Sequence, residues 1–224
     1  MNQAKELKFT ATPDKGDVSA ILLRPAKATH VLVLGHGAST NMRHPTLAAI
    51  AEALADVGIA TFRYNFPYSE KGSGRNSTAT CVATVRSAVT AAQHAAPGLA
   101  LIAGGHSFGG RMTTTAQSEG ALEHVAGLVL FSFPLHLPGR PDISRAEHLK
   151  QIGIPLLFLS GTRDDLATLS LLRPVIEGLG DRANLHLIDT ANHSYKVLKK
   201  TRVSTEDVFA EMARVARNWV DRLP

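Results

Sequence analysis

A lone serine lies in a glycine-rich turn near the middle of the chain. Residues 105–109 read Gly-His-Ser-Phe-Gly, after an apolar run and before a helix-like segment. This G-x-S-x-G pattern is typical of a sharp strand-to-helix turn that exposes a nucleophilic serine, because glycines on both sides let strand and helix approach closely. The pattern favours Ser107 as a nucleophile. Five letters by themselves also match an incidental serine in an ordinary glycine-rich turn.

Glycine-rich turns also bind phosphate, but the neighbouring residues exclude the two common versions. A P-loop has Lys and then Ser or Thr after its last glycine, whereas Gly110 and Arg111 follow Gly109 here. A dinucleotide-binding turn needs the spacing G-x-G-x-x-G at the start of its domain, and the glycines at 104, 105, 109 and 110 do not have it. We therefore expect no cofactor at this turn.

A serine hydroxyl needs a positioned base, and the base needs an orienting acid. His193 is the predicted base because it lies downstream of the turn, in a loop after a late apolar run. His186 lies inside that run, and His124, His136 and His148 precede the strand that must carry the acid, so packing or surface positions are expected for all four. The alternative for His193 is an ordinary loop histidine at the surface.

The acid is expected in the segment GTRDDL, which follows another apolar run and contains Asp164 and Asp165. One of the two is predicted to cap a helix that begins at Leu166. Asp164 is favoured as the acid, partly on the family pattern given below, and Asp165 remains the alternative. The resulting chain order is nucleophile, acid and then base, which is the order of one fold in particular.

Acyl transfer also needs two N–H donors directed at the developing oxyanion. One donor is expected from Phe108, the residue after the nucleophile. The other is expected from Ala38, in the segment GHGAS that follows an early apolar run. A glycine loop that merely ends a strand would explain Gly37, but not its position relative to the other motifs. Agreement of all these features in kind, order and spacing favours the catalytic interpretation.

These residues must be positioned by a sheet, because apolar runs alternate with helical patterns along the chain. The expected strands are 18–25, 30–35, 58–66, 98–105, 125–133, 154–161 and 184–189, and the expected helices are 44–57, 77–95, 108–120, 166–179 and 205–222. Most apolar runs are continuous, which indicates strands covered on both faces. The pattern predicts an α/β fold with a doubly wound, mostly parallel sheet.

Two finer features are expected at the ends of the chain. Residues 6–12 and 18–24 are predicted to form an antiparallel hairpin at one edge of the sheet. In the last helix, Ser204 and Thr205 are the predicted capping residues. In an open parallel sheet ligands bind at the carboxyl ends of the strands, and Ser107 follows the middle strand of the run.

Composition limits the remaining choices. The 224 residues are most simply one domain, 1–224, and are 44% apolar and 19% charged, as in a soluble globular protein. The first residues lack the apolar stretch of a secretory signal peptide, and no apolar segment reaches the length of a membrane span. We therefore expect a cytoplasmic protein that does not engage a membrane. Cys81 is the only cysteine, which excludes an internal disulfide and a cysteine metal cluster. It is expected to be a buried, inert thiol, and no metal site is expected.

The net charge of +5 is unevenly distributed. Residues 1–112 hold eleven Lys or Arg against six Asp or Glu, whereas residues 113–224 hold thirteen of each. The densest basic stretch is residues 196–202, and no aromatic residue lies between its lysines and arginine. It therefore indicates a solvated face rather than a nucleic-acid site. We expect no nucleic-acid partner.

The motifs together resemble a known family. From GHGAS through FRYNFPYSEKG, GGHSFGGR and GTRD to NHSY, essentially the whole chain is similar to small, cap-less α/β-hydrolases of bacteria, grouped near dienelactone hydrolase. The resemblance implies the α/β-hydrolase fold, a Ser107–Asp164–His193 triad and an acyl-enzyme mechanism. Dienelactone hydrolase itself has a cysteine at the turn where this chain has Ser107, so ordinary ester chemistry is favoured over dienelactone cleavage.

The resemblance also bears on access to the site. Larger relatives insert a cap domain where this chain has residues 134–152, and about twenty residues cannot form a domain with its own core. No separate cap domain is therefore expected, and the site should be an open crevice suited to small soluble esters. A thioesterase or perhydrolase with the same triad is the closest rival, and a non-catalytic binding protein on the same scaffold is the second. The oligomeric state stays open, a homodimer included.

A last expectation concerns the charge around the crevice. Arg43, Lys71, Arg75 and Arg111 fall in or beside loops that should rim it, and Glu70 is the single acid between residues 58 and 118. A positive rim would attract anionic substrates. The alternative is that these side chains pair with acids from the second half of the chain or point into solvent.

Overall fold

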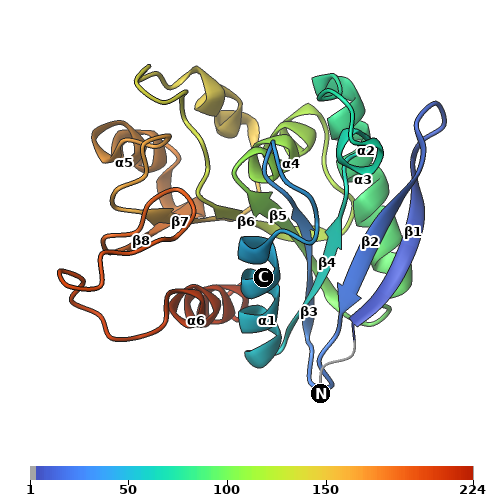
Figure 1. The fold of residues 1–224 in the computed structure, drawn as a ribbon, viewed down its shortest axis with the longest axis horizontal. Coiled ribbons are helices and arrows are strands. Elements are labelled where there is room, and N and C mark those ends of the chain that lie inside the picture. The colour runs from blue at the N-terminus through green and yellow to red at the C-terminus, as the bar shows by residue number, and fades with distance from the viewer. Residues whose placement is uncertain (1–3, 224) are drawn as a thin grey trace.

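The computed structural model describes residues 4–223, which form one eight-stranded sheet with helices on both faces (Figure 1). The strands are β1 (Ala4–Thr12), β2 (Gly16–Leu23), β3 (His30–Gly35), β4 (Ile59–Tyr64), β5 (Ala100–His106), β6 (Val125–Phe131), β7 (Leu156–Gly161) and β8 (Ala183–Ile188). The α-helices are α1 (Pro45–Asp56), α2 (Pro67–Lys71), α3 (Thr78–Ala95), α4 (Phe108–Glu119), α5 (Leu169–Glu177) and α6 (Val208–Val220). Two 3-10 helices, η1 (Ser144–Gln151) and η2 (Gly180–Arg182), complete the elements.

The strand order is β1-β2-β4-β3-β5-β6-β7-β8. Strands β1, β2 and β4 pair antiparallel, and every other neighbouring pair is parallel. The predicted hairpin at one edge and the predicted doubly wound, mostly parallel sheet are both confirmed. Strand β5 lies between β3 and β6, so the loops after β3 and β5 meet at the carboxyl edge of the sheet.

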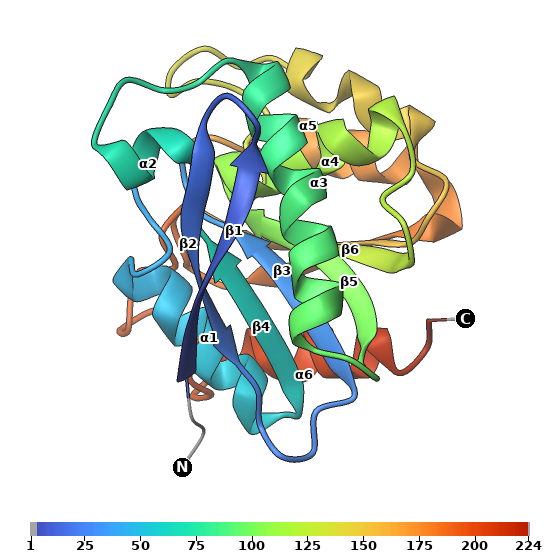
Figure 2. The ribbon, with the colours of Figure 1, turned by 90° about the vertical axis from the view of Figure 1, so that its right-hand side faces the viewer.

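Helices cover both faces of the sheet, which explains the continuous apolar runs. α1 and α6 pack against each other on one face, and α3, α4 and α5 lie on the other (Figure 1). In β3 the side chains alternate between the two cores, with Val31 and Val33 facing α3 and α4 and with Leu32 and Leu34 facing α1 and α6. Figure 2 shows α3 beside the β1–β2 hairpin, which it also contacts.

The segment between β6 and β7 contains only turns and the 3-10 helix η1, which packs on α4. It forms no layer of its own over the sheet. The expectation that no separate cap domain is present is therefore confirmed.

Two helix starts differ from the sequence prediction. Helix α5 begins at Leu169, three residues later than predicted, because the backbone of the preceding turn folds onto Asp164 instead of entering the helix. Helix α6 is capped by Asp207, not by Ser204 or Thr205, and its carboxylate accepts from the second and third helical N–H groups at 2.9 and 3.1 Å. Both prediction errors concern local competition among capping groups, not the existence of the helices.

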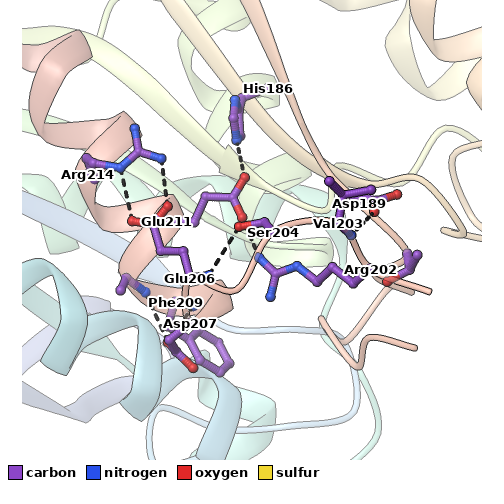
Figure 3. A network of polar contacts seen from close by, with 12 residues as sticks. His186, Asp189, Arg202, Val203, Ser204, Glu206, Asp207, Phe209, Glu211 and Arg214 are labelled. Atoms are coloured by element: carbon purple, nitrogen blue, oxygen red, sulfur yellow. Dashed lines mark hydrogen bonds and ion pairs between the residues drawn. The ribbon is translucent and has the colours of Figure 1, made fainter. Parts of the chain in front are cut away.

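The chain between β8 and α6 has no helix or strand of its own, and a buried carboxylate fixes its far end (Figure 3). Glu211 in α6 bonds His186 of β8 at 2.8 Å and Arg202 of the connecting segment at 2.5 Å. Asp189 accepts from the backbone N–H of Val203 at 3.2 Å in the same region. The two ends of this connection are thereby tied together, and His193 lies between them.

Glycines let β3, β5 and α4 come into backbone contact. A Cβ placed on Gly109 would lie 2.3 Å from the carbonyl of Gly35, and one placed on Gly105 would lie 2.5 Å from the backbone of Gly109 and Gly110. Neither position has room for any side chain. Helix α4 can therefore start directly against the ends of the two strands.

We expect Gly109→Ala to destabilise the protein by about 1–3 kcal/mol, because the added methyl group must push α4 away from β3. Gly153→Ala is the matched control, since a Cβ at that exposed position meets no atom within 4 Å. Urea unfolding of both variants measures the effect. Equal stability of the two variants would contradict the packing argument.

Candidate active site

Ser107 follows the last residue of β5 and precedes the first residue of α4. Its backbone has φ 52° and ψ −115°, a left-handed conformation that is strained for a residue with a side chain. Two hydrogen bonds hold it there: its N–H donates to Phe131 of β6 at 2.8 Å, and its carbonyl accepts from Arg111 of α4 at 3.1 Å. The turn has the geometry that the G-x-S-x-G pattern predicts, with the serine at its tip.

The side chains of Ser107, His193 and Asp164 form one chain of hydrogen bonds. The Oγ of Ser107 lies 2.8 Å from Nε2 of His193, and Nδ1 of His193 lies 2.9 Å from both carboxylate oxygens of Asp164. A carboxylate only accepts, so Nδ1 carries the ring proton and Nε2 is free to accept from the serine hydroxyl. The three residues come from the ends of β5, β8 and β7.

The structure separates the two adjacent aspartates. The Asp164 side chain is fully buried, and its Oδ1 also accepts from the backbone N–H of Leu166 at 2.9 Å. Asp165 is exposed. The prediction that one of them caps a helix starting at Leu166 is wrong: the turn after β7 uses Asp164 to fix its own backbone, and this same contact orients the carboxylate toward His193.

The loop that carries His193 is anchored by a residue that sequence analysis did not single out. His106, the residue before Ser107, is buried and donates from Nε2 to the backbone carbonyl of His193 at 3.1 Å. Burial lowers the pKa of His106 to about 4, so the ring is neutral. Tyr195 adds a second anchor by donating to the carbonyl of Leu159 at 2.7 Å. The only signal in the sequence was the position of His106 inside the turn motif.

A second buried histidine fixes the loop that holds Ala38. Nε2 of His36 accepts from the N–H of Phe66 at 3.2 Å, so Nδ1 carries the proton and donates to the carbonyl of Gly37 at 2.7 Å. Thr40 donates to the same carbonyl from its N–H and its hydroxyl. In a trans peptide the C=O and the following N–H point in opposite directions. Three donors on Gly37 therefore set the direction of the Ala38 N–H.

Phe108 occupies the first position of α4. An N–H group there has no carbonyl one turn upstream within the helix, so it is available to a ligand, and the helix dipole adds positive potential. Its ring is buried against the edges of Phe66 and Tyr68, at centroid distances of 5.5 and 6.4 Å. Packing of the ring thus holds the first turn of α4 in place.

A cavity of about 370 Å³ has Ala38 in its wall, but Phe108 and the side chains of the hydrogen-bond chain are not part of its lining. Ala38 shares its wall with Ser39, Asn41, Tyr68 and Arg75, so the lining is mostly polar. Another cavity, of about 340 Å³, lies between η1 and α5 and is lined by Ile143, Leu171 and Val175 among others. That second cavity includes none of the residues predicted to act in catalysis.

The other histidines considered as bases are engaged elsewhere. Their partners are Glu123 for His124, Thr168 for His136, Thr114 for His148 and Glu211 for His186. Cys81 is buried, as expected, and burial raises the pKa of its thiol to about 11. Between residues 4 and 223 no group of three or more His, Cys, Asp or Glu side chains is arranged to hold a metal ion. Over the same residues, none of the helices has the length and apolar character needed to cross a membrane.

The chain was compared with known families and solved structures. A family model described as an alpha/beta hydrolase domain matches residues 28–221. The chain belongs to this alpha/beta hydrolase family. The resemblance inferred from the sequence motifs is thereby confirmed, and so is the fold.

Solved structures of this α/β-hydrolase fold superimpose along nearly the whole chain. A dienelactone hydrolase from Anabaena variabilis is similar, with a TM-score of 0.75 and 19% identity over 99% of both chains. An α/β serine hydrolase without a lid, from Xanthomonas campestris, has a TM-score of 0.74 and 19% identity over 99% of this chain and 96% of its own. An esterase from Pyrococcus furiosus has a TM-score of 0.74 and 18% identity, over 99% and 93%. At these identities the likeness shows the shared fold.

The buried, neutral state of His106 predicts a pH dependence of stability. Its pKa is about 4 when folded against an ordinary value of 6.5, so the unfolded chain takes up the proton first and stability falls as the pH drops from about 6.5 to about 4. Replacing His106 by Gln removes this contribution, which amounts to about 2 kcal/mol between pH 7.5 and pH 5. Urea unfolding at the two pH values measures it. An unchanged pH dependence in His106→Gln would contradict the assignment.

Proposed function

We propose that this protein is a serine hydrolase that cleaves small soluble carboxylic esters through an acyl-enzyme intermediate. The observation that carries the proposal is the continuous hydrogen-bond chain from Asp164 through His193 to Ser107, with its terminal hydroxyl on a strained turn. Membership in the alpha/beta hydrolase family supports hydrolase chemistry, and the esterases and serine hydrolases among the similar structures are consistent with it.

In the first half of the reaction Ser107 attacks the ester carbonyl. His193 accepts the hydroxyl proton at Nε2, which lies 2.8 Å from Oγ, and Asp164 stabilises the imidazolium that forms. The N–H groups of Ala38 and Phe108 bind the oxyanion of the tetrahedral intermediate. His193 then donates its proton to the leaving alcohol, and the acyl group remains on Ser107.

The second half repeats these steps with water as the nucleophile. His193 removes a proton from the water, which attacks the acyl-enzyme, and the intermediate is stabilised by the same N–H groups. Collapse returns the proton to Ser107 and releases the carboxylic acid. Where larger relatives have a cap, this chain has only turns and η1, which packs on α4, and this supports an uncovered site and small, soluble substrates.

The two rival functions differ in what they require. A thioesterase or perhydrolase would use the same residues, so the choice among them depends on measured rates with esters, acyl-CoA thioesters and peroxide. A binding protein without catalysis would not need the strained backbone at Ser107, which costs of order 1–3 kcal/mol, or the bonded triad. The cost of this conformation favours the enzyme.

A fluorophosphonate probe should label the wild-type chain once, on Ser107, and Ser107→Ala should abolish both labelling and ester hydrolysis. Loss of a triad nucleophile lowers kcat by roughly 10⁶ in a well-studied serine protease. Mass spectrometry of the labelled peptide and p-nitrophenyl ester kinetics measure the two effects. Full esterase activity in Ser107→Ala would overturn the proposal.

The adjacent aspartates provide a matched pair for the acid. Asp164→Asn should lower kcat by up to ~10⁴, because the amide disturbs the tautomer of His193 while the fold is retained. Asp165→Asn changes an exposed neighbour and should leave kcat within about twofold of wild type, as surface substitutions usually do. Steady-state kinetics with a p-nitrophenyl ester compare them. A larger loss in Asp165→Asn would move the acid to that residue.

A further inference from the structure

The four basic residues expected at the crevice rim separate into two pairs in the structure. Arg43 forms an ion pair with Glu6 of β1 at 2.8 Å, and Lys71 donates to the backbone carbonyl of Lys15 in the β1–β2 turn at 3.1 Å. Both are therefore engaged by the hairpin. The expectation of a rim made by all four charges is wrong, and only Arg75 and Arg111 remain candidates.

Arg75 and Arg111 converge on one aromatic ring next to the nucleophile. Their guanidinium carbons lie 5.2 and 5.6 Å from the ring centroid of Phe108, the residue after Ser107. Arg75 comes from the loop after α2, and Arg111 comes from the first turn of α4. Stacking on an aromatic face holds a guanidinium in place and leaves its N–H donors free at the edges.

These two arginines have no carboxylate partner in the part of the chain that the structure describes. Neither forms a salt bridge or a side-chain hydrogen bond within residues 4–223. Burial lowers the pKa of Arg111, and the positive charges of Arg145 and Arg75 lower it further. His148, which also lies beside Arg111, has a pKa lowered to about 4 by burial and then by that arginine, so it adds no charge.

The arrangement concentrates positive charge that nothing in the described chain neutralises. The guanidinium groups of Arg75, Arg111 and Arg145 repel one another. A partly buried arginine still remains charged, because its pKa is far above neutrality. If the arginines served only to stack on the Phe108 ring, one of them would be enough, and an acid could pair with its guanidinium. The absence of an acid among residues 4–223 that approach them indicates a place kept for an anion from outside.

One of the two arginines shares a cavity with a predicted oxyanion donor. Arg75 lines the cavity of about 370 Å³ that has Ala38 in its wall, whereas Arg111 and Phe108 are not part of its lining. Arg111 lies near the nucleophile because its guanidinium approaches the Phe108 ring and its backbone N–H donates to the carbonyl of Ser107 at 3.1 Å. Because Phe108 directly follows Ser107, we expect a small ester with its carbonyl at Ser107 to extend toward the two guanidinium groups at the Phe108 ring. The planar donors of arginine match a carboxylate in a bidentate manner.

We infer that Arg75 and Arg111 form an anion-binding subsite, and that the ester substrate carries a carboxylate which this subsite binds. The inference rests on the proposed function, because it assigns the substrate class of that same site. Arg145 adds to the positive potential from η1 without contacting the Phe108 ring. The subsite raises kcat/KM for anionic esters over neutral esters of equal size.

Two pairs of esters test the preference, one with the charge on each side of the ester bond. The acyl pair is p-nitrophenyl hemiglutarate and its neutral primary amide; the alcohol pair is 4-carboxyphenyl butyrate and 4-carbamoylphenyl butyrate. In at least one pair the carboxylate ester should show a kcat/KM at least tenfold above its amide at low ionic strength. Added NaCl should reduce that ratio by screening.

Arg75→Gln and Arg111→Gln should each lower the ratio at least fivefold and leave kcat/KM of the neutral ester within about twofold. Arg43→Gln is the matched control, because it removes an equal charge that is already paired with Glu6. It should leave the ratio unchanged. If Arg111→Gln does not fold, Arg75→Gln decides, since Arg75 is exposed.

A ratio near one in both pairs, or a ratio that the two arginine variants do not lower, would overturn the subsite. Calorimetric titration of Ser107→Ala with monomethyl glutarate and with its neutral amide gives a readout that needs no catalysis. Binding of the carboxylate that is lost in Arg75→Gln supports the subsite, and equal binding of both ligands contradicts it. Loss of hydrolysis for every ester, with arginine-dependent binding retained, would refute the proposed function alone.

Discussion

The contact between the backbones of β3, β5 and α4 is the constraint on which the rest of the site depends. Gly35, Gly105 and Gly109 meet at distances where a Cβ would lie 2.3–3.0 Å from another backbone atom. This contact lets a helix begin directly at the end of the central parallel strand. The serine between them is forced into a left-handed conformation, and its half-buried side chain lies at the carboxyl edge of the sheet. The start of α4 also fixes the position of the Phe108 N–H and of Arg111 in the first turn of the helix.

Loops at that edge lack the repeated hydrogen bonds of strands, so the structure supplies other anchors. Two of them are buried histidines, His36 beside the loop with Ala38 and His106 beside the loop with His193. Burial lowers the pKa of each to about 4, which keeps both rings neutral. A neutral imidazole has one donor and one acceptor, so it can join two backbone segments in a fixed direction. The groups proposed to act in catalysis are thus held by polar contacts from residues that have no proposed chemical role.

The contrast between paired and unpaired charge connects the fold to the choice of substrate. Carboxylates at the far end of the His193 connection have structural partners within the chain: Glu211 bonds His186 and Arg202, and Asp189 accepts from the backbone N–H of Val203 (Figure 3). Beside Phe108, in contrast, two guanidinium groups approach one ring, and no carboxylate among residues 4–223 forms an ion pair with either of them. Ion pairs of the first kind hold loops together, whereas free cations at the edge of a polar cavity are suited to a ligand. The same residue type therefore has different roles at the two places.

The sequence by itself determined the alternation of strands and helices, the edge hairpin and the motif that places Ser107 after the middle strand. These features depend on local patterns: apolar period, glycine next to serine, and the order of motifs along the chain. It also singled out His193, because few histidines follow a late strand, and the structure places the ring of His193 within hydrogen-bond distance of Ser107. It did not separate Asp164 from Asp165, since adjacent letters carry the same chemistry and only burial against β7 and β8 directs one carboxylate toward the ring.

Tertiary structure alone decided which charges were free and which groups anchored the loops. Arg43 and Arg75 are indistinguishable in a charge count. In the structure Glu6 of β1 pairs with Arg43, whereas no acid among residues 4–223 pairs with Arg75. Likewise His106 contacts a carbonyl 87 positions away in the sequence. Such pairs form only when distant strands end at the same edge of the sheet. Local sequence patterns cannot encode them, because the free energy of a contact depends on partners that folding brings together.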